Sequence, residues 1–275
     1  MPAWHPHPSV WLLLGWIWVA YLLVVRRRPM SPRERAEQPR RTLLFSIGMA
    51  VLLVGADWPI HDLAEGYLYS AHMVQHMLFM LVAPPLLIAG IPAWMWRMLL
   101  GSRPVWVAFR FLTRPVVALI LFNGLLLFAH WPEIVKLSVT SELAHFSLHV
   151  LLVGSAVVVW WPVMSPLVEL PPLSPPGQIM YLFIQSLAPT IPASFLTFGH
   201  RLLYPVYGTF PRIWGISALD DQLIAGLTMK IVGGLILWGF IAVIFFRWYA
   251  REARDGWDAL ALSGVEHELR SGVRR

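Results

Sequence analysis

The chain has 275 residues, of which 57% are hydrophobic and 13% charged, with a mean hydropathy of +0.63 and a formal net charge of +6. Soluble domains carry charge on about a quarter of their residues, so this composition excludes an ordinary soluble protein and indicates a polytopic membrane protein. The sequence contains no cysteine, which excludes disulfides, iron–sulfur clusters and thiolate metal sites. Histidine, methionine and carboxylate side chains are the remaining metal ligands.

Seven stretches are apolar and long enough to cross about 30 Å of hydrocarbon. We therefore predict an all-α membrane helix bundle of about seven transmembrane helices, forming a single membrane domain over residues 1–275. The second and fourth stretches are short, so a bundle with six spans stays open as an alternative. The predicted spans lie near residues 9–25, 42–56, 70–91, 116–130, 141–161, 178–198 and 219–246.

Basic residues predict how these spans are oriented. The 26–41 loop holds seven Lys and Arg, the 92–115 loop four and the 247–275 tail six, whereas the alternate loops hold only Lys136, Arg201 and Arg212. Cytoplasmic loops are enriched in Lys and Arg, so we predict an external N-terminus and a cytoplasmic C-terminal tail. Topology and contact with anionic lipids explain the net charge, and no nucleic-acid partner is expected.

A short external loop, DWPIHDLAEGYLYS, precedes the third predicted span. Its His61 and Asp62 lead directly to His72 and are kept as lesser candidates for metal ligands. Asp57 and Glu65 are interpreted as ordinary acidic residues of a loop at the bilayer surface.

Two histidine pairs open two different spans. His72 and His76 stand in AHMVQHMLFM, and His145 and His149 stand in SELAHFSLHV. Residues i and i+4 share one helix face, so each pair can point two imidazoles at one place. Copper and zinc need three or four donors at about 2 Å. We therefore predict that the two pairs face each other near the outer bilayer boundary as primary ligands of one metal site.

Other histidines are interpreted differently. Histidine is at home in the interfacial zone of a bilayer, where an amphipathic side chain can keep its polar atoms in water. This interpretation is preferred for His5, His7, His130 and His200.

Methionine and glutamate stand beside the histidine pairs on the predicted helices. Met80 lies one turn deeper than His76, and Glu142 lies one turn above His145, where it could ligate a metal or orient an imidazole. Imidazole combined with soft thioether favours copper over zinc. A methionine stripe on a membrane helix is, by itself, typical of packing.

The seventh span begins with Asp220 and Asp221 and reaches Met229 two turns later. Its carboxylates can be metal ligands or helix N-caps, and both interpretations stay open. Lys230 lies inside the span, and we expect its long side chain to reach toward the external carboxylates.

Prolines are expected to kink two spans, because proline lacks a backbone N–H and frees carbonyl groups. They are Pro84, Pro85, Pro189 and Pro192. The proline-rich segment 166–177 is expected to be an extended cytoplasmic linker. The sequence contains no P-loop and no GxGxxG, HExxH or GxSxG motif.

Several motifs together resemble one family. The segment HMVQHMLFMLVAPPLLIAGIP is preceded by DWPIHDLA and followed by HFSLH, a WWP span end and DQLIAGLTM. These motifs, between about residues 42 and 246, resemble the CtaG-type family of multi-spanning cytochrome c oxidase assembly factors of bacteria, which are associated with caa-type oxidases. The paired histidines match the family's histidines, and Asp221 with Met229 match its last-span pattern. Lys230 stands where an apolar or aromatic residue is expected.

The resemblance implies an assembly factor that delivers copper to the oxidase from the bacterial cytoplasmic membrane. An oxidase subunit or a copper donor protein would then be its partner, and an enzymatic activity is not favoured. The first alternative is an intramembrane zinc hydrolase, with three histidine ligands and a carboxylate base. Haem transport or modification ranks third, because pairs at i and i+4 suit a compact ion better than a macrocycle.

Overall fold

The computed structural model describes residues 5–272, with side chains through residue 255. The described part of the chain is helical and contains no strand, which confirms the predicted all-α membrane bundle. The helices and two π-helical turns are α1 (Pro8–Arg27), α2 (Pro32–Ala56), α3 (Ile60–Gly66), α4 (Tyr69–Met77), η1 (Leu78–Val82), α5 (Ala83–Gly90), α6 (Ala93–Leu99), α7 (Arg103–Leu112), α8 (Pro115–Ala129), α9 (Pro132–Thr140), α10 (Glu142–Met164), α11 (Pro175–Leu187), α12 (Thr190–Phe198), α13 (Pro205–Gly208), α14 (Ala218–Leu227), η2 (Thr228–Val232) and α15 (Gly233–Gly272).

Six helical spans in the described chain are long and apolar enough to cross a bilayer, and α7 with α8 forms a seventh if the bent pair counts as one span. The two helices are bent by 82° at the break between Leu112 and Pro115. Helix α8 alone has 15 residues, fewer than the roughly 20 that a straight crossing needs. The predicted alternatives of seven and six spans therefore correspond to counting or not counting this bent pair.

The loop predicted before the third span is partly helical, which corrects the sequence interpretation. Helix α3 has seven residues and includes both His61 and Glu65. Tyr207 supports the helix by donating a hydrogen bond from its hydroxyl to the carbonyl of Ala64 over 3.1 Å. The helix turns an i, i+4 spacing into two side chains on one face.

Helix α4, the turn η1 and α5 form one continuous span from Tyr69 to Gly90. The π-helical turn comes directly before Pro84, one of the predicted kink positions. Proline 84 has no N–H to donate to the carbonyl of Met80, four residues earlier. The indole of Trp160 on α10 donates to that carbonyl instead, over 2.9 Å. At the other predicted kink, α11 ends at Leu187 and α12 begins at Thr190.

Helices α14 and α15 are likewise joined by a π-helical turn, η2, which packs against α4. Glycine favours this close approach, because a Cβ atom on Gly233 would lie 3.2 Å from the sulfur of Met77, closer than ordinary van der Waals contact. Three methionines of the span that begins with α4, Met73, Met77 and Met80, are all buried in the main hydrophobic core. Packing therefore accounts for their burial.

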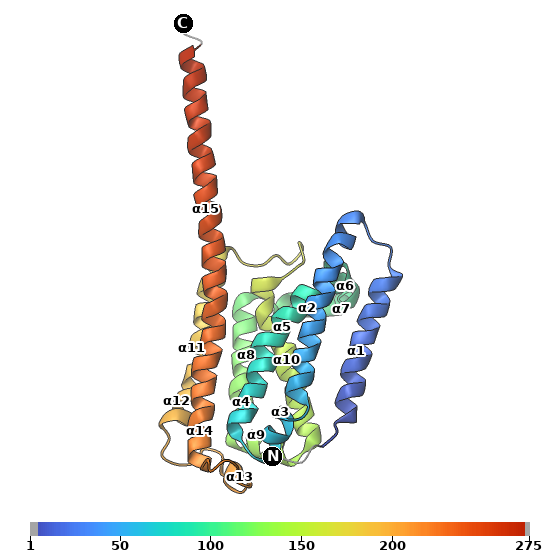
Figure 1. Ribbon diagram of the computed structural model, residues 1–275, viewed down its shortest axis with the longest axis vertical. Helices are drawn as coiled ribbons and strands as arrows, with labels where there is room; N and C mark the ends of the chain where they lie inside the picture. Colours follow the sequence, from blue (N-terminus) through green and yellow to red (C-terminus); the bar gives the residue numbers. More distant parts are fainter. Residues whose placement is uncertain (1–4, 273–275) are drawn as a thin grey trace.

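The bundle has two distinct ends (Figure 1). The first described residues, α3, α9 and α13 lie at one end, and the beginnings of α4 and α10 lie there as well. The α1–α2 connection, α6 and α7 lie at the other end, from which α15 continues far beyond the remaining helices. The segments that begin α4 and α10 carry the histidine pairs, so the candidate site belongs to the first end.

Candidate metal centre

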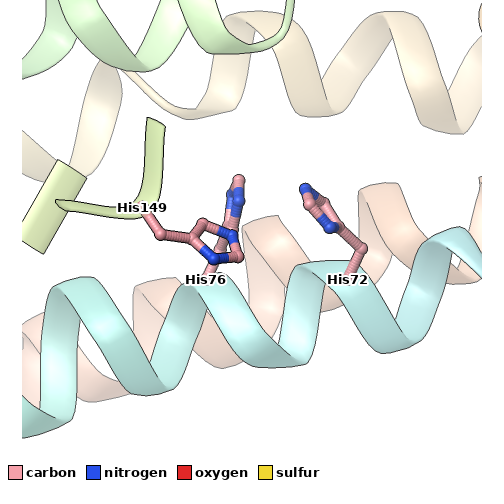
Figure 2. A group of neighbouring side chains, drawn as sticks. All are labelled: His72, His76 and His149. Atoms are coloured by element: carbon pink, nitrogen blue, oxygen red, sulfur yellow. The ribbon is translucent and has the colours of Figure 1, made fainter. Parts of the chain in front are cut away.

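Three histidines from two helices converge at the end of the bundle near α3 and α9. His72 and His76 come from α4 and His149 comes from α10, and together we call them the inner triad (Figure 2). One potential ligand atom from each lies within 4.8 Å of the other two. The ring centroids are 4.2 Å apart for His72 and His76, 6.0 Å for His72 and His149, and 5.7 Å for His76 and His149. These spacings allow one ion to bind three imidazoles after small side-chain rotations.

The inner triad is buried and has unused hydrogen-bonding capacity. His72 is 6% exposed and His76 is 3% exposed, while His149 is partly buried. The Nδ1 atoms of His72 and His76 are buried and lack a hydrogen-bond partner among the described residues. Buried polar atoms are almost always paired, and each exception calls for an explanation such as a missing ion. The triad therefore has the chemical character of a ligand set.

Helix α4 is fixed at its first turn by a carboxylate from another helix. Asp221 of α14 is fully buried and accepts hydrogen bonds from the backbone N–H of Tyr69 over 2.7 Å and that of Ser70 over 3.0 Å. The hydroxyl of Ser70 donates to the same carboxylate over 2.6 Å. Asp221 thus caps the N-terminus of α4 and is not a member of the inner triad. By fixing the first turn of α4, it fixes the position of His72 relative to α10.

A second group lies beside the first. His61 and Glu65 of α3 and His145 of α10 also have ligand atoms within 4.8 Å of one another, and we call them the outer triad. The ring centroids of His145 and His149 are 4.1 Å apart, so the two triads adjoin. The structure thus brings all four predicted primary histidines together, but His145 groups with α3 while the other three group with one another.

The lesser sequence candidates lie around these triads. Asp62 is held by the N-terminal segment, because its carboxylate lies 3.0 Å from Nε2 of His7 and accepts from the backbone N–H of His5 over 3.3 Å. Glu142 is exposed at the start of α10. Met80 and Met229 are each 2% exposed in the core and line a crevice between α4, α11 and α15.

Lys230 lies on the exposed side of η2 and lines the same crevice as Met80 and Met229. We expected it to reach the external carboxylates. Within the described residues it makes no ion pair with Asp220 or Asp221. The carboxylate of Asp221 is already used by Tyr69 and Ser70.

One member of the outer triad and two histidines beside the triads were not singled out as ligands from the sequence. Glu65 was assigned to a loop, although its spacing of four from His61 matches that of the histidine pairs. His130 is 7% exposed, and its ring centroid lies 5.5 Å from that of His76. The ring of His7 lies 4.5 Å from that of His61, so both His7 and His130 are less peripheral than the interfacial interpretation suggested.

Comparison with known proteins identifies the family. The family model described as cytochrome c oxidase caa3 assembly factor matches residues 16–251, most of the chain. The chain belongs to this family. The match confirms the resemblance seen in the motifs around the histidine pairs. No curated protein and no solved structure matches the chain.

Proposed function

We propose that this family member handles copper during assembly of a caa3-type cytochrome c oxidase in the bacterial cytoplasmic membrane, and that its inner triad holds the ion. The observation that carries the proposal is the convergence of three largely buried imidazoles, two of which have a buried Nδ1 atom without a partner among the described residues. Imidazole nitrogen is a good ligand for copper. The family's role in oxidase assembly supports copper as the cargo.

The geometry of the inner triad also bears on the alternatives. Its ring centroids are only 4.2–6.0 Å apart, which suits a single ion. Haem ligation places axial groups on the iron of a wide macrocycle, so the compact spacing supports an ion over haem. An oxidase subunit or a copper donor protein would exchange the ion at the end of the bundle that carries both triads.

Zinc hydrolysis is the second candidate, and one observation favours it. The outer triad combines two histidines with a carboxylate, a ligand set that hydrolytic zinc sites use with an open position for water. A hydrolase would turn over amide or ester substrates when loaded with zinc. A copper-handling factor would bind Cu(I) in a defined ratio without turnover.

The test measures Cu(I) binding by the full-length chain, purified with an affinity tag that contains no histidine and so does not bind copper itself. In anaerobic solution a chromogenic Cu(I) chelator competes with the protein, and the decrease in absorbance of its copper complex gives the amount of Cu(I) bound to the protein. We expect the inner triad to hold one Cu(I), and His76→Ala and His149→Ala each to abolish this binding. Because both side chains serve one ion, the double variant should lose little more than either single variant.

The matched control is His200→Ala, because His200 is exposed and belongs to neither triad. It should bind Cu(I) like the parent protein. In cells, the oxidase isolated from a strain carrying His76→Ala should contain less copper than the oxidase from the His200→Ala strain. Equal Cu(I) binding by all five proteins, together with equal copper in the oxidase, would contradict the proposal.

A further inference from the structure

Glu65 of the outer triad bridges two imidazoles with its two carboxylate oxygens. Its Oε2 lies 3.3 Å from Nε2 of His61, one turn away on α3. Its Oε1 lies 3.0 Å from Nδ1 of His145 on α10. Two separate helices thus direct three donor groups at one place, outside the inner triad.

His145 is the most unusual member of this group. Its side chain is only 5% exposed, yet the contacts of its ring nitrogens with described residues, which include Glu65 and the backbone of Ser138, do not have hydrogen-bond geometry. The contact of Nδ1 with Glu65 is short but does not have hydrogen-bond geometry. Leaving a buried polar group unpaired costs about 1–3 kcal/mol. A bound ion would supply the missing interaction.

The other two donors are held in place by their surroundings. Nε2 of Gln75, a fully buried residue of α4, donates to the carbonyl of Gly55 over 2.8 Å and lies 3.2 Å from Nδ1 of His61. The ring of His7 packs edge-on against His61, and His7 is tethered to Asp62. These contacts fix the His61 ring with its Nε2 atom toward Glu65.

We propose that the outer triad is a second metal site, which takes a divalent cation of the Cu(II) or Zn(II) kind. A carboxylate oxygen is a harder donor than imidazole nitrogen, so a ligand set of two histidines and one glutamate suits these divalent ions better than Cu(I). The negative charge of Glu65 also reduces repulsion between an ion here and one in the adjoining inner triad. The Glu65 side chain is 31% exposed, which gives an ion access from outside the bundle. The proposal does not require the inner triad to be occupied.

The experiment titrates Cu(II) into the full-length detergent-purified protein and counts bound ions by electron paramagnetic resonance, with Zn(II) binding measured in parallel. We expect one divalent ion at the outer triad, counted in a His76→Ala background because three imidazoles of an intact inner triad also bind Cu(II) and Zn(II). In that background His61→Ala should lose this ion, and the isosteric Glu65→Gln should weaken its binding at least tenfold, while both changes made singly keep Cu(I) at the inner triad. His76→Ala should show the reverse pattern, losing Cu(I) and keeping the divalent ion.

Glu133→Gln and His200→Ala are matched controls, because both residues are exposed and belong to neither triad. Binding of Zn(II) without Cu(II), or of Cu(II) without Zn(II), would support the site and identify its ion. Undiminished divalent binding by both His61→Ala and Glu65→Gln would overturn it, as would a parent protein that binds neither ion. Loss of Cu(I) together with the divalent ion in the conservative Glu65→Gln variant would also overturn it, because that result means one shared site. The proposed function is tested separately, because it depends on whether His76→Ala loses Cu(I), whereas this inference depends on whether His61→Ala and Glu65→Gln lose the divalent ion.

Discussion

At the scale of single residues, a proline and a tryptophan from different helices complement each other. Pro84 leaves the carbonyl of Met80 without its usual helical donor, and the indole of Trp160 takes that place. Inside a bilayer no water is available to do so, and an unsatisfied carbonyl is costly. The π-helical turn before Pro84 is therefore stabilised by a side chain of α10.

This pairing predicts different effects for two adjacent tryptophans. Trp160 and Trp161 are 1% and 2% exposed, but Nε1 of Trp161 is buried and has no hydrogen-bond partner among the residues that the structure describes. Both Trp→Phe changes remove similar volume, but only Trp160→Phe also orphans the Met80 carbonyl. We expect Trp160→Phe to lower the free energy of unfolding by about 1–3 kcal/mol more than Trp161→Phe. Thermal or denaturant unfolding in detergent measures this difference, and equal losses would show that the indole hydrogen bond contributes nothing.

The individual residues differ in how far the sequence predicts them. The two histidine pairs are visible because their spacing matches the helix period, and the structure does bring them together. Glu65 has the same spacing from His61, but it falls in a segment without a long hydrophobic pattern. The role of Trp160 depends on a contact between residues 80 positions apart, and no local pattern indicates such a contact.

At the scale of elements, the first turn of α4 depends on α14. The Asp221 carboxylate accepts three hydrogen bonds from Tyr69 and Ser70. Hydrogen bonds to charged groups contribute about 1.5–3 kcal/mol each, and a lost cap alone costs about 1 kcal/mol. His72 stands one turn beyond this cap, so stability of α4 and geometry of the inner triad are coupled.

We therefore expect Asp221→Ala to lower the thermal stability and to weaken Cu(I) binding at the inner triad, although Asp221 is not one of its three ligands. Asp220→Ala is the control. Asp220 is exposed and hydrogen-bonds with Ser217 at the start of its own helix, so its loss should have a small effect on both quantities. Unfolding temperature and Cu(I) affinity, measured on both variants, check the prediction. Equal effects of the two substitutions would mean that the cap on α4 does not position the triad.

Elements also differ in how far the sequence determines them. Long spans such as α10 follow from hydropathy, because an apolar run of that length has few alternatives in a membrane. Helix α3 has only seven residues, and helices this short are not stable by themselves. It forms where α4 and Tyr207 support it. From the sequence, Asp221 can be either a metal ligand or a helix N-cap. The sequence does not decide between these roles, because Asp221 caps a helix other than its own and the two bonded residues are 152 positions apart.

At the scale of the whole molecule, charge and metal ligands are segregated. The end of α1 and the start of α2, with their connection and with α6 and α7, hold most of the basic residues of the first half and lie at one end of the bundle. Helix α3 and the N-terminal parts of α4 and α10, which supply both triads, belong to the other end. Lys and Arg are retained on the cytoplasmic side of membranes. The end of the bundle with the basic residues is therefore expected to face the cytoplasm, and the end with both triads is expected to face outward.

The last prediction tests that orientation with reporters. The connection between α13 and α14 is exposed at Trp214 and Gly215, and it lies at the triad end (Figure 1). Alkaline phosphatase, which is active only outside the cytoplasm, should therefore be active when inserted there and inactive when fused after Arg275. A fluorescent protein that matures in the cytoplasm should give the reverse result, and insertion at Gly101, between α6 and α7, should behave like the C-terminal fusion. Phosphatase activity at Gly101 and after Arg275, with none at Trp214, would place both triads on the cytoplasmic side. External delivery of copper to an oxidase would then lose its structural basis, even if both triads bind metal in solution.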